Sequence, residues 1–192
     1  EFNSQHIAPS AEVMESLITI NNQLGLHSAA AGILKCVQTR YRDQVTIRPR
    51  WLEELSRWEE ASTLYHQFQS ETINKYTIDE KAKEIYCKDK EWIEYELGIM
   101  RCQHALGEYE ELIDSAAALK GHIENSYANL VHTSNDNTTT SSDVMNDFTT
   151  GTTTSSIITK TIDDRDQWLA EVQRLGSSAS WMLGSWGDLE AF

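Results

Sequence analysis

A seven-residue pattern recurs four times in the chain and sets what it can fold into. It reads "LGLHSAA" at 24–30, "LSRWEEA" at 55–61, "LGEYEEL" at 106–112 and "LGSWGDL" at 183–189. In each copy a leucine is followed by a small residue, any residue, a ring, two mostly polar residues, and alanine or leucine. The small residue lets the chain turn tightly at the end of a helix, and the ring is expected to pack into the turn. The pattern therefore predicts corners between paired helices.

These corners predict an all-α fold, because a single helical hairpin cannot bury both of its faces and must stack on its neighbours. The tetratricopeptide (TPR) repeat does this with a period of about 34 residues. We therefore expect a TPR-like α-solenoid of antiparallel helical hairpins, with irregular spacing between the corners. The residues expected to form the corners are Leu24, Gly25, Leu55, Trp58, Ala61, Leu106, Gly107, Tyr109, Leu112, Leu183, Gly184, Trp186 and Leu189.

Helical periodicity in the first 70 residues predicts two hairpins. The first helix begins after Ser10, a plausible N-cap, and ends near Gly25. A second helix and a short third one, which begins near Pro49, follow it. The fourth helix continues from Trp58. The apolar stripes are Val13, Leu17, Ile20 and Leu24 on the first helix, Ala30, Ile33, Leu34, Val37 and Tyr41 on the second, Trp51, Leu52 and Leu55 on the third, and Ala61, Leu64, Tyr65 and Phe68, facing inward, on the fourth.

Two further hairpins are expected after an ambiguous polar segment at 70–90, in which a helix is predicted from Asp79. The third hairpin turns at Gly107, and the fourth begins after residue 161. Their stripes are Trp92, Tyr95, Ile99, Cys102 and Leu106, then Leu112, Ile113, Ala116 and Leu119, and finally Trp168, Val172, Leu175, Ala179 and Met182.

Residues 133–161 are rich in serine and threonine and have few apolar residues. This composition predicts a disordered insertion between a helical array at 1–132 and its truncated continuation at 162–192. The tract is either a tolerated insertion or a phosphorylated one, and the sequon at Asn137 should be silent without a secretory signal. Because the chain begins without methionine and stops within a corner copy, we expect a piece of a longer protein.

The charge of the chain excludes some classes of partner. Sixteen basic and 30 acidic residues give a net charge of -14, which repels nucleic acid and anionic lipid headgroups. No apolar run is long enough to cross a membrane. Cys36, Cys87 and Cys102 lie far apart, so neither a disulfide framework nor a zinc site is predicted. A cytosolic setting is expected.

The sequence assembles no catalytic constellation. A phosphate-binding glycine loop and the HRD and DFG pattern of protein kinases are absent. We therefore expect no catalytic residue, cofactor or metal in this chain. The acidic pairs at 59–60 and 110–111 suit helix N-termini, with an acidic contact to a basic partner as the alternative. Most tryptophans are expected in the core, with a peptide groove as the alternative. The histidines, expected on or near the surface, are His6, His27, His66, His104, His122 and His132.

Several stretches together resemble the FAT region of target of rapamycin (TOR) kinases, in the phosphatidylinositol-kinase-related kinase family. The matching stretches occur in the family's order and are "ESLITINNQLG" at 15–25, "AAAGIL" at 29–34, "WLEELSRWEEA" at 51–61, "LGIMRCQHALGEYEEL" at 97–112 and "SSASWMLGSWGDLE" at 177–190. The segments at 70–90 and 120–165 are longer than the family's pattern.

The resemblance implies a non-catalytic scaffold that restrains a kinase domain of the same polypeptide. That parent is expected to be a serine/threonine kinase using ATP and magnesium in nutrient and growth signalling. It would be dimeric in its complex, bound to companion subunits, and cytoplasmic with peripheral placement at endomembranes. The alternative is a freestanding TPR-like adaptor that binds a partner peptide; an independent enzyme is not supported by any motif.

Overall fold

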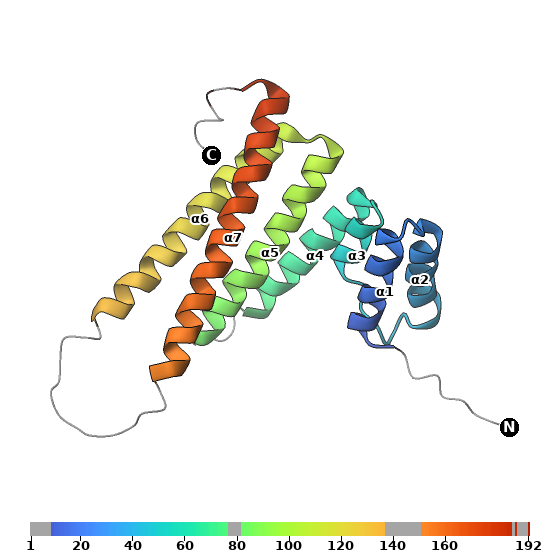
Figure 1. Cartoon of the computed structure of the whole chain (residues 1–192), viewed down its shortest axis with the longest axis horizontal. Helices are drawn as coiled ribbons and strands as arrows, with labels where there is room; N and C mark the ends of the chain where they lie inside the picture. The colour runs from blue at the N-terminus through green and yellow to red at the C-terminus, as the bar shows by residue number, and fades with distance from the viewer. Residues whose placement is uncertain (1–8, 77–81, 137–150, 186, 188–191) are drawn as a thin grey trace. The chain divides into compact units, whose positions relative to one another are not determined.

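In a computed structural model, every regular element of the described residues is an α-helix, which confirms the all-α prediction for them (Figure 1). The structure describes residues 9–76, 82–136, 151–185, 187 and 192, with segments 73–76, 82–89, 127–136 and 151–162 described by their backbone alone. The helices are α1 (Ala11–Gln23), α2 (His27–Arg40), α3 (Pro49–Glu54), α4 (Trp58–Tyr76), α5 (Ala82–Leu106), α6 (Tyr109–Asp136) and α7 (Gly151–Leu183). The likeness to TPR repeats stays a prediction.

Local chemistry sets the starts of α1 and α3 where the sequence predicts them. The Ser10 hydroxyl accepts a hydrogen bond from the Val13 amide at 3.4 Å, which satisfies one of the amides left without a partner in the first turn of α1. Pro49 occupies the first turn of α3, where its missing amide is no loss and its fixed φ suits the helix. Both predicted helix starts are confirmed.

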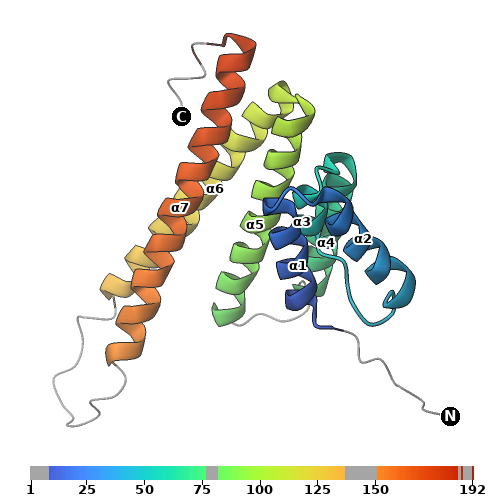
Figure 2. The ribbon, with the colours of Figure 1, turned by 45° about the vertical axis from the view of Figure 1, so that its right-hand side comes forward.

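The chain forms two compact units, Glu1–Leu106 and Gly107–Phe192. In the first unit α1 packs on α2, α3 on α4, and α4 on α5, as Figure 2 shows from a second direction. The first two predicted hairpins are therefore confirmed. The predicted third hairpin would join α5 to α6, which belong to different units; within the second unit the helix packed on α6 is α7.

The buried core of the first unit lies among its five helices. Its fully or nearly buried members are Met14, Ile18, Ala30, Leu34, Val37, Val45, Trp51, Leu52, Ala61, Tyr65, Ile99 and Cys102. The inward residues predicted for α2 and α4 are all among these or are packed partly buried against them, except Phe68, which is half-buried. On α5, Ile93, Leu97 and Met100 are also buried, and the sequence prediction missed them.

The apolar stripe predicted for α1 is not its core face. Val13, Leu17, Ile20 and Leu24 share one side of the helix, but they are 42–68% exposed, whereas Met14 and Ile18 are buried. The reason lies in the sequence of α1, which is apolar on two sides. The residues at 14 and 18 face α2 and α3, and the longer stripe is left on the surface.

The second unit is one hairpin of two long helices, α6 and α7, which lie side by side in Figures 1 and 2. Its buried residues repeat every three or four positions on both helices. They are Leu112, Ala116, Leu119 and Ile123 on α6, and Trp168, Val172, Leu175 and Ala179 on α7. Three residues differ from the sequence prediction, since Ile123 was missed, Ile113 is only half-buried and Met182 is 59% exposed.

The predicted insertion at 133–161 is described only at its two ends, and both are helical. Helix α6 continues to Asp136 and α7 already begins at Gly151, so the boundaries predicted at 133 and 161 are too wide. Ile157 precedes Trp168 by eleven residues, which is helical spacing, and Ile158 and Ile162 are four apart, an apolar signal that the composition of the tract conceals. Residues 137–150, with the sequon, lie outside the described residues, as does the helix start predicted at Asp79.

Candidate functional site

The four predicted corners share one backbone conformation at their small residue. Gly25, Gly107 and Gly184 have φ of 72°, 81° and 69°, and Ser56 has φ of 56°. These values lie in the left-handed region, which glycine enters freely and which costs other L-residues about 1–2 kcal/mol. Ser56 is the only non-glycine residue with positive φ in the described part of the chain. The requirement for a small residue therefore comes from the backbone.

Three corners are also closed by the same pair of backbone hydrogen bonds. The amide of the small residue donates to the carbonyl three residues back, and the next amide donates to the carbonyl five residues back. The pairs are Gly25 to Asn22 at 2.9 Å with Leu26 to Asn21 at 2.8 Å, Ser56 to Glu53 at 2.8 Å with Arg57 to Leu52 at 2.9 Å, and Gly184 to Trp181 at 3.1 Å with Ser185 to Ser180 at 2.9 Å. This is the Schellman closure of a helix end.

The side chains around the corners differ more than their backbones. Leu55 is packed partly buried against the core, whereas Leu24, Leu106 and Leu183 are 68%, 36% and 41% exposed. The closing alanine or leucine is fully buried where it is described, at Ala30, Ala61 and Leu112. It stands in the first turns of the second helix and allows the close approach that the sequence predicts.

The rings of the corner pattern occupy the start of the second helix of each pair. His27, Trp58 and Tyr109 are the first residues of α2, α4 and α6. Trp58 packs partly buried on the first core, and a Tyr109 ring carbon lies 3.9 Å from where a Cβ on Gly107 would be. His27 is exposed. Trp186 and Leu189 lie outside the described residues, so their corner role stays a prediction.

A half-buried polar cluster beneath the second corner joins α3, α4 and α5. The Arg101 guanidinium donates from Nε to Glu53 Oε2 at 2.8 Å and from Nη2 to Glu53 Oε1 at 3.1 Å. The Tyr65 hydroxyl donates to the same carboxylate. Burial, and then the neighbouring Glu53 charge, raise the pKa of Tyr65, so the phenol stays protonated and keeps donating. The cluster ties the ends of α3 and α5 to the first half of α4.

A glycine on α5 makes room for this cluster. A methyl group on Gly98 would overlap the ring of Tyr65, so the ring can lie against the α5 backbone only because position 98 has no side chain. Tyr65 and Phe68 also contact the ring of Tyr95 on α5, with centroids 6.2 and 6.1 Å apart. No sequence motif singles out Gly98; its position inside a strongly apolar helix is the signal that points to a packing role.

The first corner is held by a bridging amide. Asn22 Nδ2 donates to the Glu54 backbone carbonyl at 2.6 Å, which ties the end of α1 to the end of α3. Asn22 Oδ1 is 2.7 Å from Nδ1 of His27 at the start of α2. Arg48, which caps α3, also reaches α1 and binds Glu12 and Glu15 at 2.8 and 2.7 Å. These polar contacts join the first hairpin to the second.

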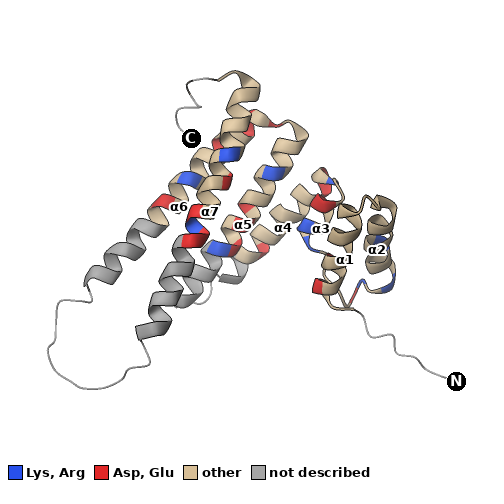
Figure 3. Cartoon of the chain, in the orientation of Figure 1, with Lys and Arg blue, Asp and Glu red and all other residues tan. Residues whose placement is uncertain are grey.

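Two acidic pairs begin helices in the described part of the chain. Glu59 and Glu60 stand in the first turn of α4, and Glu110 and Glu111 in that of α6, which confirms their predicted place at helix N-termini. Figure 3 shows acidic positions spread over several helices. Within the described ranges, no three histidine, cysteine or acidic side chains come together as metal ligands. No described helix is both long and apolar enough to cross a membrane.

The tryptophans divide between core and surface. Trp51 and Trp168 are buried and Trp58 and Trp92 are partly buried, as predicted, but Trp181 is 63% exposed. Trp181 lies near the end of α7, next to the exposed Met182 and Leu183. The core prediction is therefore wrong for Trp181, because the apolar residues of the last turn of α7 exceed what α6 covers.

Repeated corners, a buried alanine or leucine after three of them, and polar contacts between helix ends define an all-α protein of helical hairpins. Half of the chain is similar to TOR-type serine/threonine kinases. It is 38% identical over 100 residues to the serine/threonine-protein kinase TOR of Arabidopsis thaliana, covering 52% of this chain, and 37% identical over 105 residues to mTor of Drosophila melanogaster, covering 53%. It is 31% identical over 107 residues to tor1 of Schizosaccharomyces pombe, covering 56%.

The matched segments make up only 3–4% of the length of these relatives. The similarity is therefore to a short segment of much longer kinases, and it agrees with the resemblance to TOR kinases found in the sequence. No protein-family model matches the chain.

Proposed function

We propose that this chain is a non-catalytic scaffold segment of a TOR-type serine/threonine kinase and corresponds to part of its FAT region. The observation that carries the proposal is the 31–38% identity, over half of the chain, to kinases of which the segment is a few per cent. The stretches that carry the FAT resemblance include the corners described above, where the backbone demands a small residue. A scaffold needs such corners, because they set the angle between consecutive helices.

In this proposal the phosphoryl transfer takes place on a kinase domain elsewhere in the parent polypeptide. A kinase must hold the ATP phosphates, bind magnesium through carboxylates and position a base. The sequence of this chain contains none of the motifs that do so. ATP and magnesium therefore belong to the parent kinase domain, and the helices described here restrain that domain and support assembly with companion subunits.

The exposed stripe on α1 supports a role inside a larger helical assembly. Four large aliphatic side chains, Val13, Leu17, Ile20 and Leu24, stand in water on one side of the helix. An apolar stripe of this kind on a helix ordinarily packs against another element. We assign it to a neighbouring hairpin of the parent polypeptide. The parent acts as a dimer in the cytoplasm and at endomembranes.

The experiment replaces Leu17 and Ile20 together by serine, both in the isolated chain and in the longer polypeptide that contains it. Since both side chains are already exposed, the isolated variant should melt within a few degrees of the unmodified chain. The longer polypeptide should lose recovery of companion subunits and show altered kinase activity. Lys35→Ser, an exposed position on α2, is the control. A reading frame that stops just after Phe192, or phosphate transfer by the isolated chain, would refute the proposal.

A freestanding adaptor that binds a peptide is the second candidate, and it is favoured by a groove on the first unit between the end of α2, segment 42–47 and α4. The two candidates separate in one comparison, because an adaptor should bind its peptide as an isolated chain and needs no kinase domain in the same polypeptide.

A further inference from the structure

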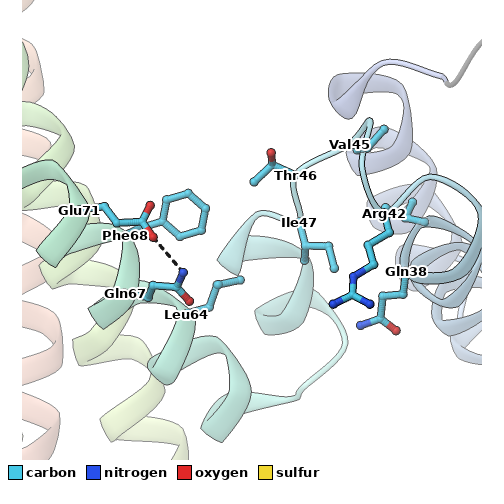
Figure 4. Close-up of a pocket in the computed structure, with 10 residues that line it drawn as sticks. Gln38, Arg42, Val45, Thr46, Ile47, Leu64, Gln67, Phe68 and Glu71 are labelled. Atoms are coloured by element: carbon cyan, nitrogen blue, oxygen red, sulfur yellow. Dashed lines mark hydrogen bonds between the residues drawn. The ribbon is translucent and has the colours of Figure 1, made fainter. Parts of the chain in front are cut away.

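A groove of about 690 Å³ opens on the first unit between the end of α2 and the second half of α4. Its floor is apolar, with Val37 and Val45 buried and Ile47, Leu64 and Phe68 half-buried. Exposed polar side chains form its rim. Figure 4 shows the α4 residues on one wall and Arg42 with Gln38 on the other, with Thr46 and Ile47 between them. Sites that bind side chains or ligands have this apolar floor, polar rim and size.

The groove exists because α3 is too short to cover α4. Helix α3 has six residues and α4 has 19, so their lengths are about 9 and 28 Å at 1.5 Å per residue. The two helices are joined at the Ser56 corner, so α3 lies beside the first turns of α4 only. In place of further turns of α3, the irregular segment 41–48 forms the far side. The second half of α4 therefore lacks a helical neighbour on this side.

The exposed wall of α4 is a single helical ridge. Leu64, Gln67, Phe68 and Glu71 stand at i, i+3, i+4 and i+7, the spacing at which one helix packs its side chains into another. The described part of the chain has no strand whose edge an extended peptide could join. The shape of the wall therefore suits a helix, which would lie beside α4 where α3 has already ended.

We propose that this groove binds one amphipathic helix of a partner protein, with its apolar stripe on Leu64, Phe68 and Ile47. Arg42 and Glu71 stand on opposite walls, so the helix must carry an acidic residue along one edge of the stripe and a basic residue along the other. Glu71 accepts a hydrogen bond from Gln67 at 2.9 Å, which holds the carboxylate on its wall. The partner helix would lie in the groove, and the charges of Arg42 and Glu71 would select which way along the groove it runs.

A second copy of the chain does not suit the groove. Among the residues whose side chains are described, an exposed apolar stripe with the right spacing lies on α1, whose sequence "AEVMESLITINNQ" contains no lysine or arginine to face Glu71. The strongly negative net charge of -14 also disfavours a copy and favours a helix with basic residues. The inference goes beyond the scaffold role and does not depend on it.

The test is selection from a library of 16-residue helical peptides with leucine or phenylalanine fixed at i, i+4 and i+7 and random residues elsewhere. Selection uses the unmodified 192-residue chain alone, and Gln67→Trp is kept for the affinity test that follows, since that exposed position lets an indole fill the groove. Enriched peptides should carry an acid and a base on opposite edges. Their affinity should fall at least tenfold for Gln67→Trp but not for His66→Trp, an exposed position beside it that does not line the groove.

A charge exchange then tests the direction. Glu71→Lys should weaken an enriched peptide about five- to tenfold, because it replaces a surface attraction by a repulsion, and exchanging the peptide's base for glutamate should restore binding. Glu59→Lys, on the same helix but outside the groove, should leave affinity unchanged. The proposal would be overturned if no peptide were enriched, if enriched peptides bound Gln67→Trp equally well, or if extended proline-rich peptides were enriched. Self-association of the chain that Gln67→Trp abolishes would also overturn it, in favour of a second copy as the occupant.

Discussion

The first and second corners have the same backbone but different surroundings. Both close with the same two hydrogen bonds, around Gly25 in one and Ser56 in the other. At the first corner the leucine and the ring are exposed, and the contacts beneath it are those of Asn22. At the second, Leu55 and Trp58 pack on the core above the Glu53, Tyr65 and Arg101 cluster.

The comparison shows that the corner pattern combines two separate requirements, one of the backbone and one of side-chain packing. The small residue is required by the backbone, which adopts a left-handed φ at the corner whatever side chains pack around it. The burial of the leucine and the ring depends on which neighbouring helix covers them, so it changes from corner to corner. The predictions below follow from this separation.

The largest expected effect is at the polar cluster of the second corner. Arg101→Met leaves the Glu53 carboxylate, whose side chain is 11% exposed, without its charged partner, while Arg101 itself is 30% exposed. Removing one member of a buried pair costs 3–5 kcal/mol, and the partial exposure here reduces the expected loss to about 2–3 kcal/mol. Urea denaturation followed by circular dichroism measures it.

The matched control is Arg57→Met, because Arg57 also binds a glutamate, Glu60, through two nitrogens. Those side chains are 41% and 54% exposed, so the loss should be at most about 0.5 kcal/mol. Equal losses for the two variants would show that the cluster is no more than a surface ion pair.

The ring position gives the next largest difference. Trp58→Ala removes a partly buried indole from the first core and should cost about 2 kcal/mol, below the 3–5 kcal/mol of a fully buried tryptophan. His27→Ala, at the same position of the first corner, changes an exposed side chain and should cost about 0.5 kcal/mol or less. Thermal melting of both variants measures the difference. If His27→Ala proved the more damaging, the ring would act through Asn22 rather than through packing.

The small residue should show the opposite behaviour at the two corners. Ser56→Gly relieves a positive φ that serine adopts at a cost, and should stabilise the chain by about 0.5–1 kcal/mol. Gly25→Ala places a methyl group at φ of 72° and should destabilise it by about 1 kcal/mol, although nothing crowds that position. Chemical denaturation of both variants checks the signs. A destabilising Ser56→Gly would mean that the serine hydroxyl contributes more than its backbone costs.

The corners were predictable because the signal is local. Glycine after a leucine at the end of an apolar stripe indicates a helix end with a left-handed residue, and three of the four copies contain that glycine. Ser56 followed from its place in the repeat. The apolar spacing also predicted most of the buried residues on α2, α4, α6 and α7, since each of these helices has one clear stripe.

The face of α1 and the polar cluster were not predictable from local pattern. Helix α1 has apolar residues on two sides, and only the position of its neighbours decides that Met14 and Ile18 are buried. Glu53 is 12 residues from Tyr65 and 48 from Arg101, so no spacing rule brings the three together. The groove depends on the shortness of α3, which Pro49 signals, and on the course of segment 41–48, which nothing in the letters determines.

The smallest expected effect is at the ion pairs that join α1 to Arg48. The backbone amide of Glu12, then the Ser10 hydroxyl and the Arg48 guanidinium, lower the pKa of the Glu12 carboxyl below its ordinary value of 4.5. A carboxyl with a lowered pKa in the folded state stabilises the fold above its unfolded pKa and loses that contribution as the pH falls through the folded value. Glu12→Gln should therefore lower the melting temperature slightly at neutral pH, and the difference should shrink as the pH falls below 4.5 and through the lower folded pKa. Because the carboxylate is exposed, 1 M salt should remove most of the same difference at neutral pH. Melting curves of both proteins across pH provide the measurement, and a difference that grew on acidification would contradict the assigned role.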